Sequence, residues 1–411
     1  MGAETGVGRR VFSILLQASL LAVCICTNLW AGGPLGAESV RAGAVRDPSR
    51  AKNIIFMVAD GMGLGDVTAA RIFKNGLNGP LLHLELSRVG YTRTYAADGV
   101  VTDSAAAASA WACGEKFNRG EICKHRDGRS HKAGILEIAE KKGKSTGLVV
   151  TSAITNATPA AFGAHVANRA CEGEIARQYI TETGVDVLLG GGRSRFSGIV
   201  PDLCGANRDS IAEAVKRGYR VAYTKEEMEA AVAARDGGGA RGVKKLLGLF
   251  ADDWLTPEKD RTEETTEPTL SEMTRAALNI MEKDADGFFM MVEGSQVDRG
   301  KHQNDAHYQL TEILAFDEAV KTVLEWIDRA PERRHRTLVI VVSDHETGGF
   351  AIKGPGDSVV EAGTKVDSGW VTRGHTGTDV VIWSQGPGSH MLARPGIENS
   401  SVYDVMAGVL K

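Results

Sequence analysis

The sequence has no long run of basic residues, and its formal net charge is −4 at pH 7. Proteins that bind nucleic acid usually carry clustered Lys and Arg on one face. The composition therefore gives no reason to expect nucleic acid as a specific partner, and an anionic substrate would have to be held by local charge. The sequence also contains no CxxC pair, which disfavours a Cys/His zinc finger, and it has no internal repeat or low-complexity tract.

A stable membrane span is not expected either. The apolar run from Val11 to about Cys26 is short for a span. It follows Arg9-Arg10 and precedes the small residues of Ala31–Ala37, which is the pattern of an export signal and also fits a twin-arginine signal. Leu21–Cys24 only loosely resembles a lipidation site, so a lipid anchor is less favoured. We expect an exported, periplasmic protein with a signal and flexible leader over residues 1–50.

Cysteine is scarce, with six residues in the whole chain. Cys24 and Cys26 fall in the predicted signal, and the other four are Cys113, Cys123, Cys171 and Cys204. An even number in an exported chain predicts two disulfides. Four cysteines allow three connectivities, and the sequence alone does not choose among them.

The composition is that of a soluble globular protein, with 411 residues of which 43% are hydrophobic and 24% charged. From Ala51 onward, short and mostly continuous apolar strands alternate with helical stretches. This pattern is typical of an α/β protein whose parallel sheet is covered on both faces. The expected strands are Asn53–Ala59, Thr146–Val150, Val185–Leu189, Tyr219–Tyr223, Gly287–Val292, Leu338–Val342 and Val380–Trp383, and the expected helices include Ile135–Lys142, Glu226–Ala234, Leu270–Glu282 and Asn304–Asp328.

We therefore predict an α/β fold, a three-layer α/β/α sandwich with a large, mostly parallel central sheet, formed by residues 51–411 as a single domain. Three stretches break the alternation. Asp236–Gly239 is a Gly-rich loop, and Asp252–Pro268 is polar and acidic. Gly348–Gly377 lacks periodicity and is predicted to be a long surface excursion that carries site residues.

Three predicted strands end in acidic residues, which are Asp60, Glu293 and Asp344. In open α/β sheets the carboxyl ends of the strands are where ligands bind, so these three carboxylates should converge on one edge. A single acidic residue there is usually a helix cap. Three together repel one another unless a cation lies among them, and His345 directly follows Asp344. A divalent metal site is therefore predicted.

Further ligands lie nearby in the sequence. Asp298 and His302 are spaced i, i+4, which places both on one face of a helix, and His375 lies in a Gly-flanked loop. Sets of Asp with two His, and of two Asp with His, suit zinc. An oxygen-rich set of Asp60, Glu293 and a Thr hydroxyl suits magnesium better. The remaining histidines have no comparable set of candidate ligands near them in the sequence and are interpreted as surface or structural residues. They are His83, His125, His131, His165, His307, His335 and His390.

Ser104 begins an Ala-rich run with high helix propensity, so it should lie at or near a helix N-terminus. Such a position favours an alkoxide or a bound phosphate. Ser at a helix start is far more often only a cap, but a neighbouring metal site makes Ser104 a candidate nucleophile for phosphoryl transfer. Arg169 is the candidate guanidinium for the phosphate oxygens, although the sequence around it alone favours a solvated surface residue.

The chain resembles the alkaline phosphatase family from about Asn53 to Gly386. The motifs that carry the resemblance occur in the order and spacing of the family. They are Asp60–Gly63, Thr102–Ala105, Ala157–Ala160, Arg169, Val187–Gly192, Glu267–Leu270, Met291–Gly294, Asp298, His302, Asp344-His345 and His375–Gly377.

The resemblance implies a metal-dependent phosphomonoesterase that acts on small phosphate monoesters, and commonly a homodimer. Two in-line displacements are implied, the first forming a phosphoserine at Ser104 and the second attacking it with a zinc-bound hydroxide. Arg169 would hold the phosphate and Asp103 would orient Arg169. The implied cofactors are two Zn²⁺ and one Mg²⁺, held by Asp298, His302 and His375, by Asp60, Asp344 and His345, and by Asp60, Thr158 and Glu293.

Two positions depart from the family pattern. Asn156 stands where relatives carry Asp or His beside the third metal, and Arg299 stands where they carry Lys, His or Trp near the phosphate. We expect a weakly held third ion and stronger phosphate binding at the expense of product release. The stretches Asn118–Lys132 and Arg193–Thr266 match the family less well. Correspondence with the paired cysteines of animal relatives would join Cys123 to Cys171.

Two other interpretations stay open from the sequence. A phosphodiesterase, mutase or sulfatase of the same metal-dependent superfamily would keep a similar metal cage with a different nucleophile context. A non-catalytic scavenger of zinc or phosphate is a second class. The presence of both Ser104 and Arg169 disfavours the scavenger, since a zinc store needs neither.

Overall fold

The computed structural model describes residues 50–129, 131–206, 208–234, 242–353, 361–363 and 366–410. The predicted signal and leader, apart from Arg50, and the predicted loop Asp236–Gly239 lie outside these residues. Residues Asp47–Lys411 form one compact unit. Among the described residues, no helix is both long and apolar enough to cross a bilayer.

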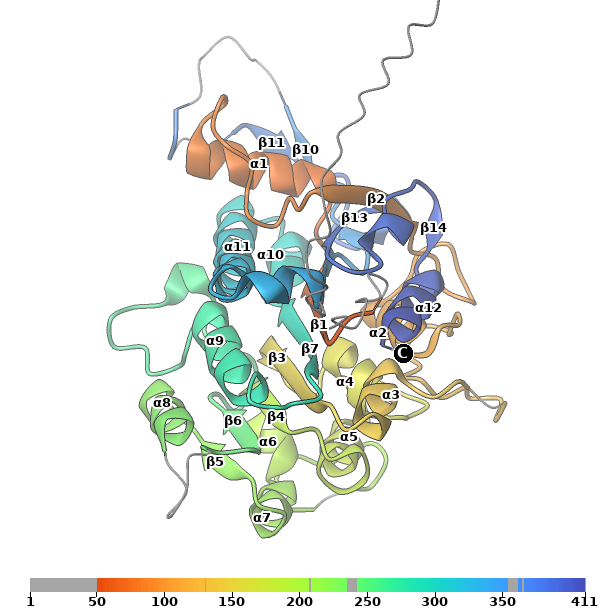
Figure 1. Ribbon diagram of the computed structural model, residues 1–411. Helices are drawn as coiled ribbons and strands as arrows, with labels where there is room; N and C mark the ends of the chain where they lie inside the picture. Colours follow the sequence, from red (N-terminus) through yellow and green to blue (C-terminus); the bar gives the residue numbers. More distant parts are fainter. Residues whose placement is uncertain are drawn as a thin grey trace, which may run out of the picture. The chain divides into compact units, whose positions relative to one another are not determined.

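A ten-stranded sheet runs through this unit (Figure 1). Only β13 runs antiparallel to its neighbours in this sheet; the other strands share one direction. In spatial order the strands are β14 (Ile397–Glu398), β2 (Arg88–Arg93), β13 (Val380–Gln385), β8 (Thr337–Val342), β1 (Asn53–Ala59), β7 (Phe288–Gly294), β3 (Ser145–Ala153), β4 (Val187–Gly191), β6 (Leu246–Leu249) and β5 (Arg220–Ala222).

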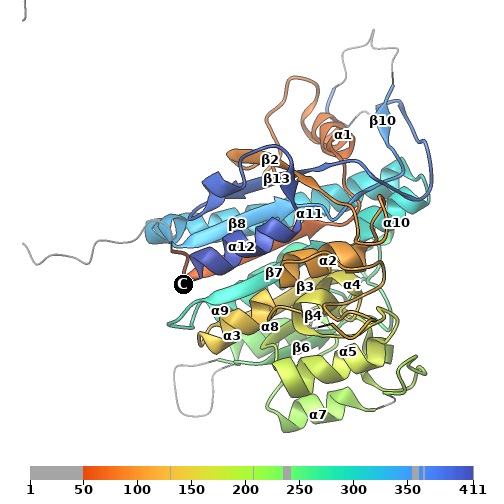
Figure 2. The ribbon, with the colours of Figure 1, turned by 90° about the vertical axis from the view of Figure 1, so that its right-hand side faces the viewer.

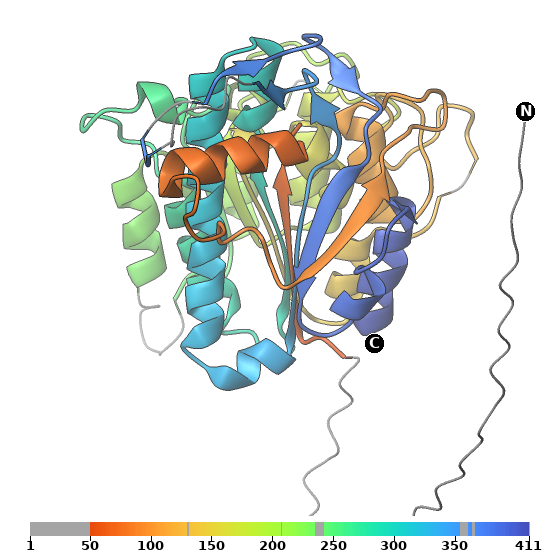
Figure 3. The same ribbon diagram turned by 90° about the horizontal axis from the view of Figure 1, so that it is seen from above.

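Helices cover both faces of the sheet (Figures 2 and 3). Strand β1 shows why, since Ile54, Phe56 and Val58 enter one apolar core while Ile55 and Met57 enter the other. One face carries α2 (Ser104–Cys113), α3 (Ile135–Lys141), α4 (Ala157–Gly163), α5 (Glu172–Gln178), α6 (Arg193–Phe196), α7 (Ser210–Lys216) and α12 (Ser400–Val409), and the other carries α1 (Leu64–Asn75), α8 (Lys225–Ala233), α9 (Leu270–Met281), α10 (Gln296–His302) and α11 (Ala306–Asp328). The predicted three-layer sandwich is confirmed.

The seven predicted strands all form, and three strands of the ten-stranded sheet, β2, β6 and β14, were not predicted. Strand β2 has Arg at both ends and four of its six residues are exposed, so it shows no continuous apolar run. Strand β6 has four residues and includes Gly248, which weakens its signal. Both lie away from the central strands, and β2 pairs with β13, which is distant in the sequence.

The predicted excursion Gly348–Gly377 contains short paired strands in its described part. Strand β10 (Ala351–Ile352) pairs with β11 (Ser368–Gly369), and β12 (His375–Thr376) pairs with β9 (Glu346–Thr347). The second pair joins the excursion to the segment that follows β8. It thereby places His375 beside the carboxyl end of the central strands. The polar stretch Asp252–Pro268 includes a single 3₁₀ turn, Glu258–Asp260.

Two disulfides form, as predicted, and they join Cys113 to Cys123 and Cys171 to Cys204. The Cys123–Cys171 pairing implied by animal relatives is therefore wrong for this chain. Cys123 is held instead against the C-terminal end of α2, where Cys113 is the last helical residue. The Cα atoms of Cys113 and Cys123 lie 6.2 Å apart, within the range that a disulfide spans.

Glu312 lies on the buried side of α11, where its carboxyl accepts the backbone N–H of Glu258 at 2.8 Å. Burial raises the pKa of Glu312 from 4.5 to about 8. The unfolded chain loses this proton near pH 4.5 and the folded chain keeps it until about pH 8, so stability falls as pH rises through this window and levels off above it. We expect Glu312→Gln to remove this loss, a gain of about 2–5 kcal/mol in the free energy of unfolding at pH 9 relative to pH 5.

Urea unfolding of wild type and Glu312→Gln at pH 5, 7 and 9 measures this difference. Glu325→Gln, on the exposed side of the same helix, is the matched control and should follow the wild type. Curves of Glu312→Gln and wild type that stay parallel across this pH range would contradict the argument.

Candidate active site

The three acidic residues predicted at strand ends do meet at one edge of the sheet. They follow or end the adjacent central strands β1, β7 and β8. In the sheet register, Val58 of β1 lies opposite both Glu293 of β7 and Val342 of β8. Asp60 and Asp344 each follow two residues after this level, so the carboxylates share the carboxyl edge.

The first cluster consists of Asp60, Asp344 and His345, all buried. Nε2 of His345 lies 3.0 Å from Oδ2 of Asp344 and 3.7 Å from Oδ1 of Asp60. The other oxygen of Asp344 accepts the backbone N–H of Gly61 at 3.0 Å. Burial, together with the negative charge of Asp344, raises the pKa of Asp60 well above its usual value. The protein itself therefore supplies too little positive charge for these carboxylates.

The second cluster consists of Asp298 and His302 from α10 and His375 from β12. Nε2 of His302 lies 3.1 Å from Oδ2 of Asp298 and 3.2 Å from Nε2 of His375, while Nε2 of His375 lies 3.9 Å from Oδ1 of Asp298. Asp298 raises the pKa of His302 to about 9 through their hydrogen bond. The Nδ1 atom of His302 bonds the Arg373 carbonyl. The Nε2 atoms of His302 and His375 therefore both face Asp298.

The two clusters adjoin each other. The rings of His345 and His375 are stacked with centroids 3.6 Å apart, and Asp298, His345 and His375 also form a group with ligand atoms within 4.8 Å of one another. The Thr347 hydroxyl joins them, since it donates to Oδ1 of Asp298 at 2.5 Å and lies 3.2 Å from Nδ1 of His345.

Two buried oxygens at this edge, Oδ1 of Asp60 and Oγ1 of Thr158, have no hydrogen-bond partner among the described residues. Oδ2 of Asp344 has only its ion-pair contact with Nε2 of His345. A buried polar atom without a partner is costly. Carboxylate, hydroxyl and imidazole groups are suitable metal donors. The donor atoms present therefore fit bound cations.

Glu293 and Thr158 lie at the oxygen-rich side of the site. Burial raises the pKa of Glu293 to about 7, against the opposing effect of a hydrogen bond from Ser295. The Ser295 hydroxyl donates to Oε2 of Glu293 at 2.6 Å. Thr158 is in the first turn of α4, whose N-cap is Asn156.

Ser104 is the first residue of α2, an Ala-rich helix that ends at Gly114 in the left-handed conformation. The N-cap is Asp103, whose carboxylate accepts the N–H of Ala106 at 3.0 Å. The interpretation of Ser104 as an ordinary helix cap is therefore wrong. Its buried hydroxyl lies instead 3.4 Å from Nε2 of His345, beside the first cluster.

Arg169 lies in the segment between α4 and α5, with its side chain one-third exposed. Its Nη1 donates to Oδ2 of Asp103 at 3.1 Å, and its Nη2 donates to Oδ1 of Asn156 at 3.1 Å. Oδ1 of Asn156 also accepts the N–H of Ala157 at 2.7 Å. The guanidinium is thus oriented by the residue directly before Ser104 and by the N-cap of α4.

Arg299 is exposed on α10, next to Asp298. Its guanidinium lies over the ring of Trp254, 5.0 Å from the centroid. The sequence singled out Arg299, but nothing in it pointed to this aromatic partner. Trp254 lies in the polar stretch that follows β6.

The sequence did not predict a buried ion-pair network that includes Lys301 of α10. Lys301 is fully buried and pairs with Asp66 and with Glu346, the latter at 3.0 Å. Glu346 also accepts the hydroxyl of Thr376 at 2.5 Å, next to His375. A lysine on a polar helix gives no sequence signal that it is buried. The only hint of this ion-pair network in the sequence was Glu346, the acidic residue after His345.

The structure also has a cavity away from this site. This cavity of about 870 Å³ lies near the amino ends of β3 and β6 and is lined by residues such as Glu140, Lys144, Asp186 and Lys244.

The histidines interpreted as structural include His125, which stacks on Phe117, and His165, which bonds Glu137 and the Cys123 carbonyl.

Comparison with known proteins places this site in a family. A family model described as alkaline phosphatase matches residues 51–366. Alkaline phosphatase 3 of Bacillus subtilis is 32% identical, with 94% of this chain and 95% of that protein covered. Among solved structures, the alkaline phosphatase of the Antarctic bacterium TAB5 is 32% identical with a TM-score of 0.73, covering 88% of this chain and 98% of its own, and that of Thermus thermophilus is 26% identical with a TM-score of 0.76, covering 92% and 96%. The chain belongs to the alkaline phosphatase family.

Proposed function

We propose that this chain hydrolyses phosphate monoesters with Ser104 as the nucleophile, as a metal-dependent phosphomonoesterase of the alkaline phosphatase family. One observation carries the assignment of residues. The Ser104 hydroxyl lies 3.4 Å from His345 of the acidic and imidazole clusters, while Asp103, directly before it, holds the guanidinium of Arg169. Nucleophile, metal donors and phosphate-binding cation thus lie together.

Two zinc ions and one magnesium ion fit the donor sets. Asp298, His302 and His375 would hold one zinc, and Asp60, Asp344 and His345 would hold the other. Asp60, Glu293 and Thr158 would hold magnesium, with Asn156 beside it. The support is the excess of acidic over basic groups in the site and the oxygens of Asp60 and Thr158 that have no hydrogen-bond partner among the described residues. A histidine-to-aspartate variant of the TAB5 enzyme is described with Mg bound in its M3 site.

The chain's own residues would act in two displacements. Oγ of Ser104 attacks phosphorus while the ester P–O bond breaks and the alcohol leaves with a proton. Water then attacks the phosphoserine, and the Ser104 hydroxyl is restored as phosphate departs. Arg169 offers a planar fork to two phosphate oxygens throughout. When bound, the cations would lower the pKa of the Ser104 hydroxyl and of water, and stabilise the entering and leaving oxygens.

Three further proposals concern the substrate, the location and the oligomeric state of the protein. The substrate is a small phosphate monoester; the support is the match to the alkaline phosphatase family and the Arg169 guanidinium beside Ser104, which can bind two phosphate oxygens. The protein is exported to the periplasm; the support is two disulfides, which persist in oxidising compartments. A homodimer stays a prediction of the family resemblance.

Assay of one metal-replete preparation against a phosphate monoester, a phosphate diester and a sulfate ester tests the function. We expect the monoester to be hydrolysed with by far the largest kcat/KM. Faster hydrolysis of the diester or of the sulfate ester would support the other members of the superfamily instead.

Arg299 is expected to strengthen phosphate binding from the rim of the site. Its exposure implies screening by solvent, so Arg299→Ala should raise the inhibition constant of inorganic phosphate by about twofold to fivefold and speed phosphate release. Competitive inhibition measured at low and moderate salt checks this, with Arg299→Lys as the charge-retaining control. An unchanged inhibition constant in Arg299→Ala would rule the role out.

The third cation is expected to bind weakly because Asn156 is neutral and its Oδ1 already accepts two hydrogen bonds. Calorimetric titration of Mg²⁺ into metal-stripped protein reloaded with zinc should show saturation only well above trace concentrations. Asn156→Asp should tighten Mg²⁺ binding by about tenfold, since partners around a metal shift affinity by 10–100-fold. Asn168→Asp, at a nearby half-buried asparagine, is the control of equal charge. Saturation of the wild type at trace Mg²⁺ would count against this prediction.

A further inference from the structure

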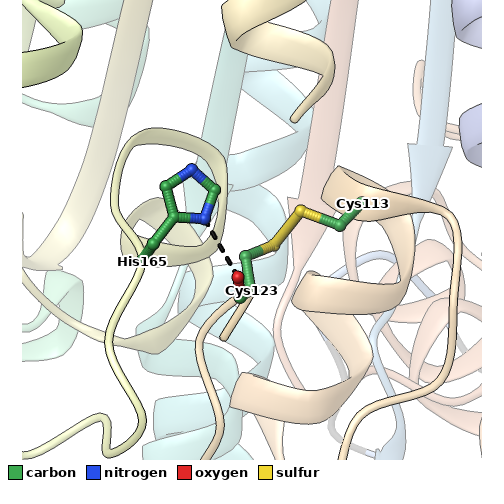
Figure 4. Close-up of side chains that lie close together, drawn as sticks. All are labelled: Cys113, Cys123 and His165. Carbon is green, nitrogen blue, oxygen red and sulfur yellow. Dashed lines mark hydrogen bonds between the residues drawn. A yellow bond between two sulfur atoms is a disulfide. The ribbon is translucent and has the colours of Figure 1, made fainter. Parts of the chain in front are cut away.

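A buried disulfide closes the C-terminal end of α2, the helix whose N-terminal end carries Asp103 and Ser104. Cys113 is its last residue and is bonded to Cys123 (Figure 4), and both side chains are fully buried. Ser109 reinforces the attachment, since its hydroxyl accepts the N–H of Cys123 at 3.0 Å and donates to the Glu121 carbonyl at 3.1 Å. The loop from Gly114 to Cys123 therefore returns to α2 at a fixed place.

The end of this loop is also bonded to the segment that carries Arg169. Ile122 and Val166 exchange two backbone hydrogen bonds of 3.0 Å, and the Gly120 carbonyl accepts the N–H of Arg169 at 2.8 Å. At the other end, Nδ1 of His165 bonds the Cys123 carbonyl at 3.0 Å, the dashed line in Figure 4. These bonds form a short antiparallel ladder that begins at the disulfide and ends at Arg169.

Gly120 connects the ladder to the proposed phosphate site. Its carbonyl holds the backbone of Arg169, and its N–H donates to both carboxylate oxygens of Asp103, at 3.2 and 3.1 Å. Asp103 in turn accepts Nη1 of Arg169 at 3.1 Å. One loop residue therefore sets the position of the guanidinium and of the carboxylate that orients it.

We infer that the Cys113–Cys123 disulfide is a positioning element for phosphate binding, acting through the Gly120 loop on Asp103 and Arg169. The segment around Arg169 lies between α4 and α5 and has no regular strand or helix of its own. The ladder holds it from the α2 side, and the disulfide ties the ladder to the nucleophile's helix, while bonds of His165 to Gln178 hold it from the α5 side. This inference rests on the proposed role of Arg169 in holding phosphate.

A double-mutant cycle tests whether the disulfide acts through Arg169. Cys113→Ala/Cys123→Ala is prepared in the wild type and in Arg169→Ala, and competitive inhibition by inorganic phosphate is measured with kcat and KM for a monoester. In the wild-type background we expect the inhibition constant and KM to rise by about tenfold, the value of one charge-assisted hydrogen bond. In the Arg169→Ala background removal of the disulfide should change neither further.

Two other variants keep the test decisive. Leu247→Ala, in the buried strand β6 away from the loop, controls for loss of stability and should leave phosphate inhibition unchanged. Ser109→Ala retains the disulfide but removes its supporting bonds, so the inhibition constant should rise by about twofold to fivefold even if the cysteine variant folds poorly.

An inhibition constant that stays at the wild-type value in both the cysteine and the Ser109 variants would overturn the inference. An equal rise in the Arg169→Ala background would also overturn it, because the effect would not pass through Arg169. A wild-type protein that neither hydrolyses monoesters nor binds phosphate would instead overturn the proposed function.

Discussion

Replacement of Ser104 by Ala is expected to lower kcat for a phosphate monoester by about 10⁴-fold to 10⁶-fold, the range seen when a covalent nucleophile is removed. The physical reason is that the Ser104 hydroxyl lies at the N-terminus of α2 and 3.4 Å from Nε2 of His345, where the proposed cations and the helix dipole would activate it. The metal content of the variant should match the wild type, since Ser104 is outside the proposed donor sets. Stopped assays and metal analysis of the same preparation measure both quantities.

Ser210→Ala is the matched control for this substitution. Ser210 is buried and is the first residue of α7 after an Asp N-cap, as Ser104 is in α2, but α7 lies near β5 and not at the site. Its replacement should leave kcat within about twofold, as for a substitution outside the reacting groups. Unchanged turnover in Ser104→Ala would contradict the assignment of the nucleophile.

Removal of the metals is expected to abolish hydrolysis and to lower stability together. Without cations, four carboxylates remain close at one buried edge, those of Asp60, Glu293, Asp298 and Asp344, and their repulsion is only partly relieved by His345 and its neighbours. We expect activity below about 1% of the wild type and a loss of about 3–4 kcal/mol in the free energy of unfolding, as for a ligand present at 100–1,000 times its dissociation constant.

Chelation followed by thermal or urea unfolding, and then readdition of zinc and magnesium, measures both effects. Ser104→Ala treated in the same way is the control, because it should lose the same stability although it has no activity to lose. If the chelated wild type keeps both its turnover and its unfolding midpoint, the carboxylate clusters hold no functional cation.

The sequence was sufficient to predict the acidic edge, because parallel strands end on the same side of a sheet. Asp60, Glu293 and Asp344 each follow a continuous apolar run, so their shared edge followed from local pattern alone. That the three strands are also adjacent, in the order β8, β1 and β7, did not follow, since strand order depends on crossover connections. The i, i+4 spacing of Asp298 and His302 was equally readable, because it is set within one helix.

The surroundings of Arg169 were not predictable in the same way. Its partners Asp103, Gly120 and Asn156 come from three segments, and loop hydrogen bonds depend on tertiary placement and leave no periodic signal. The disulfide connectivity failed for the same reason, since three pairings were equally consistent with the spacing. Strand β2 was missed because four of its six residues are exposed.

The most direct test of the account is anomalous diffraction at the zinc edge from crystals grown with zinc and magnesium. The account predicts two strong zinc peaks in each chain, one among Asp60, Asp344 and His345 and the other among Asp298, His302 and His375. A map without anomalous peaks at this edge, or with zinc bound only elsewhere on the chain, would contradict it.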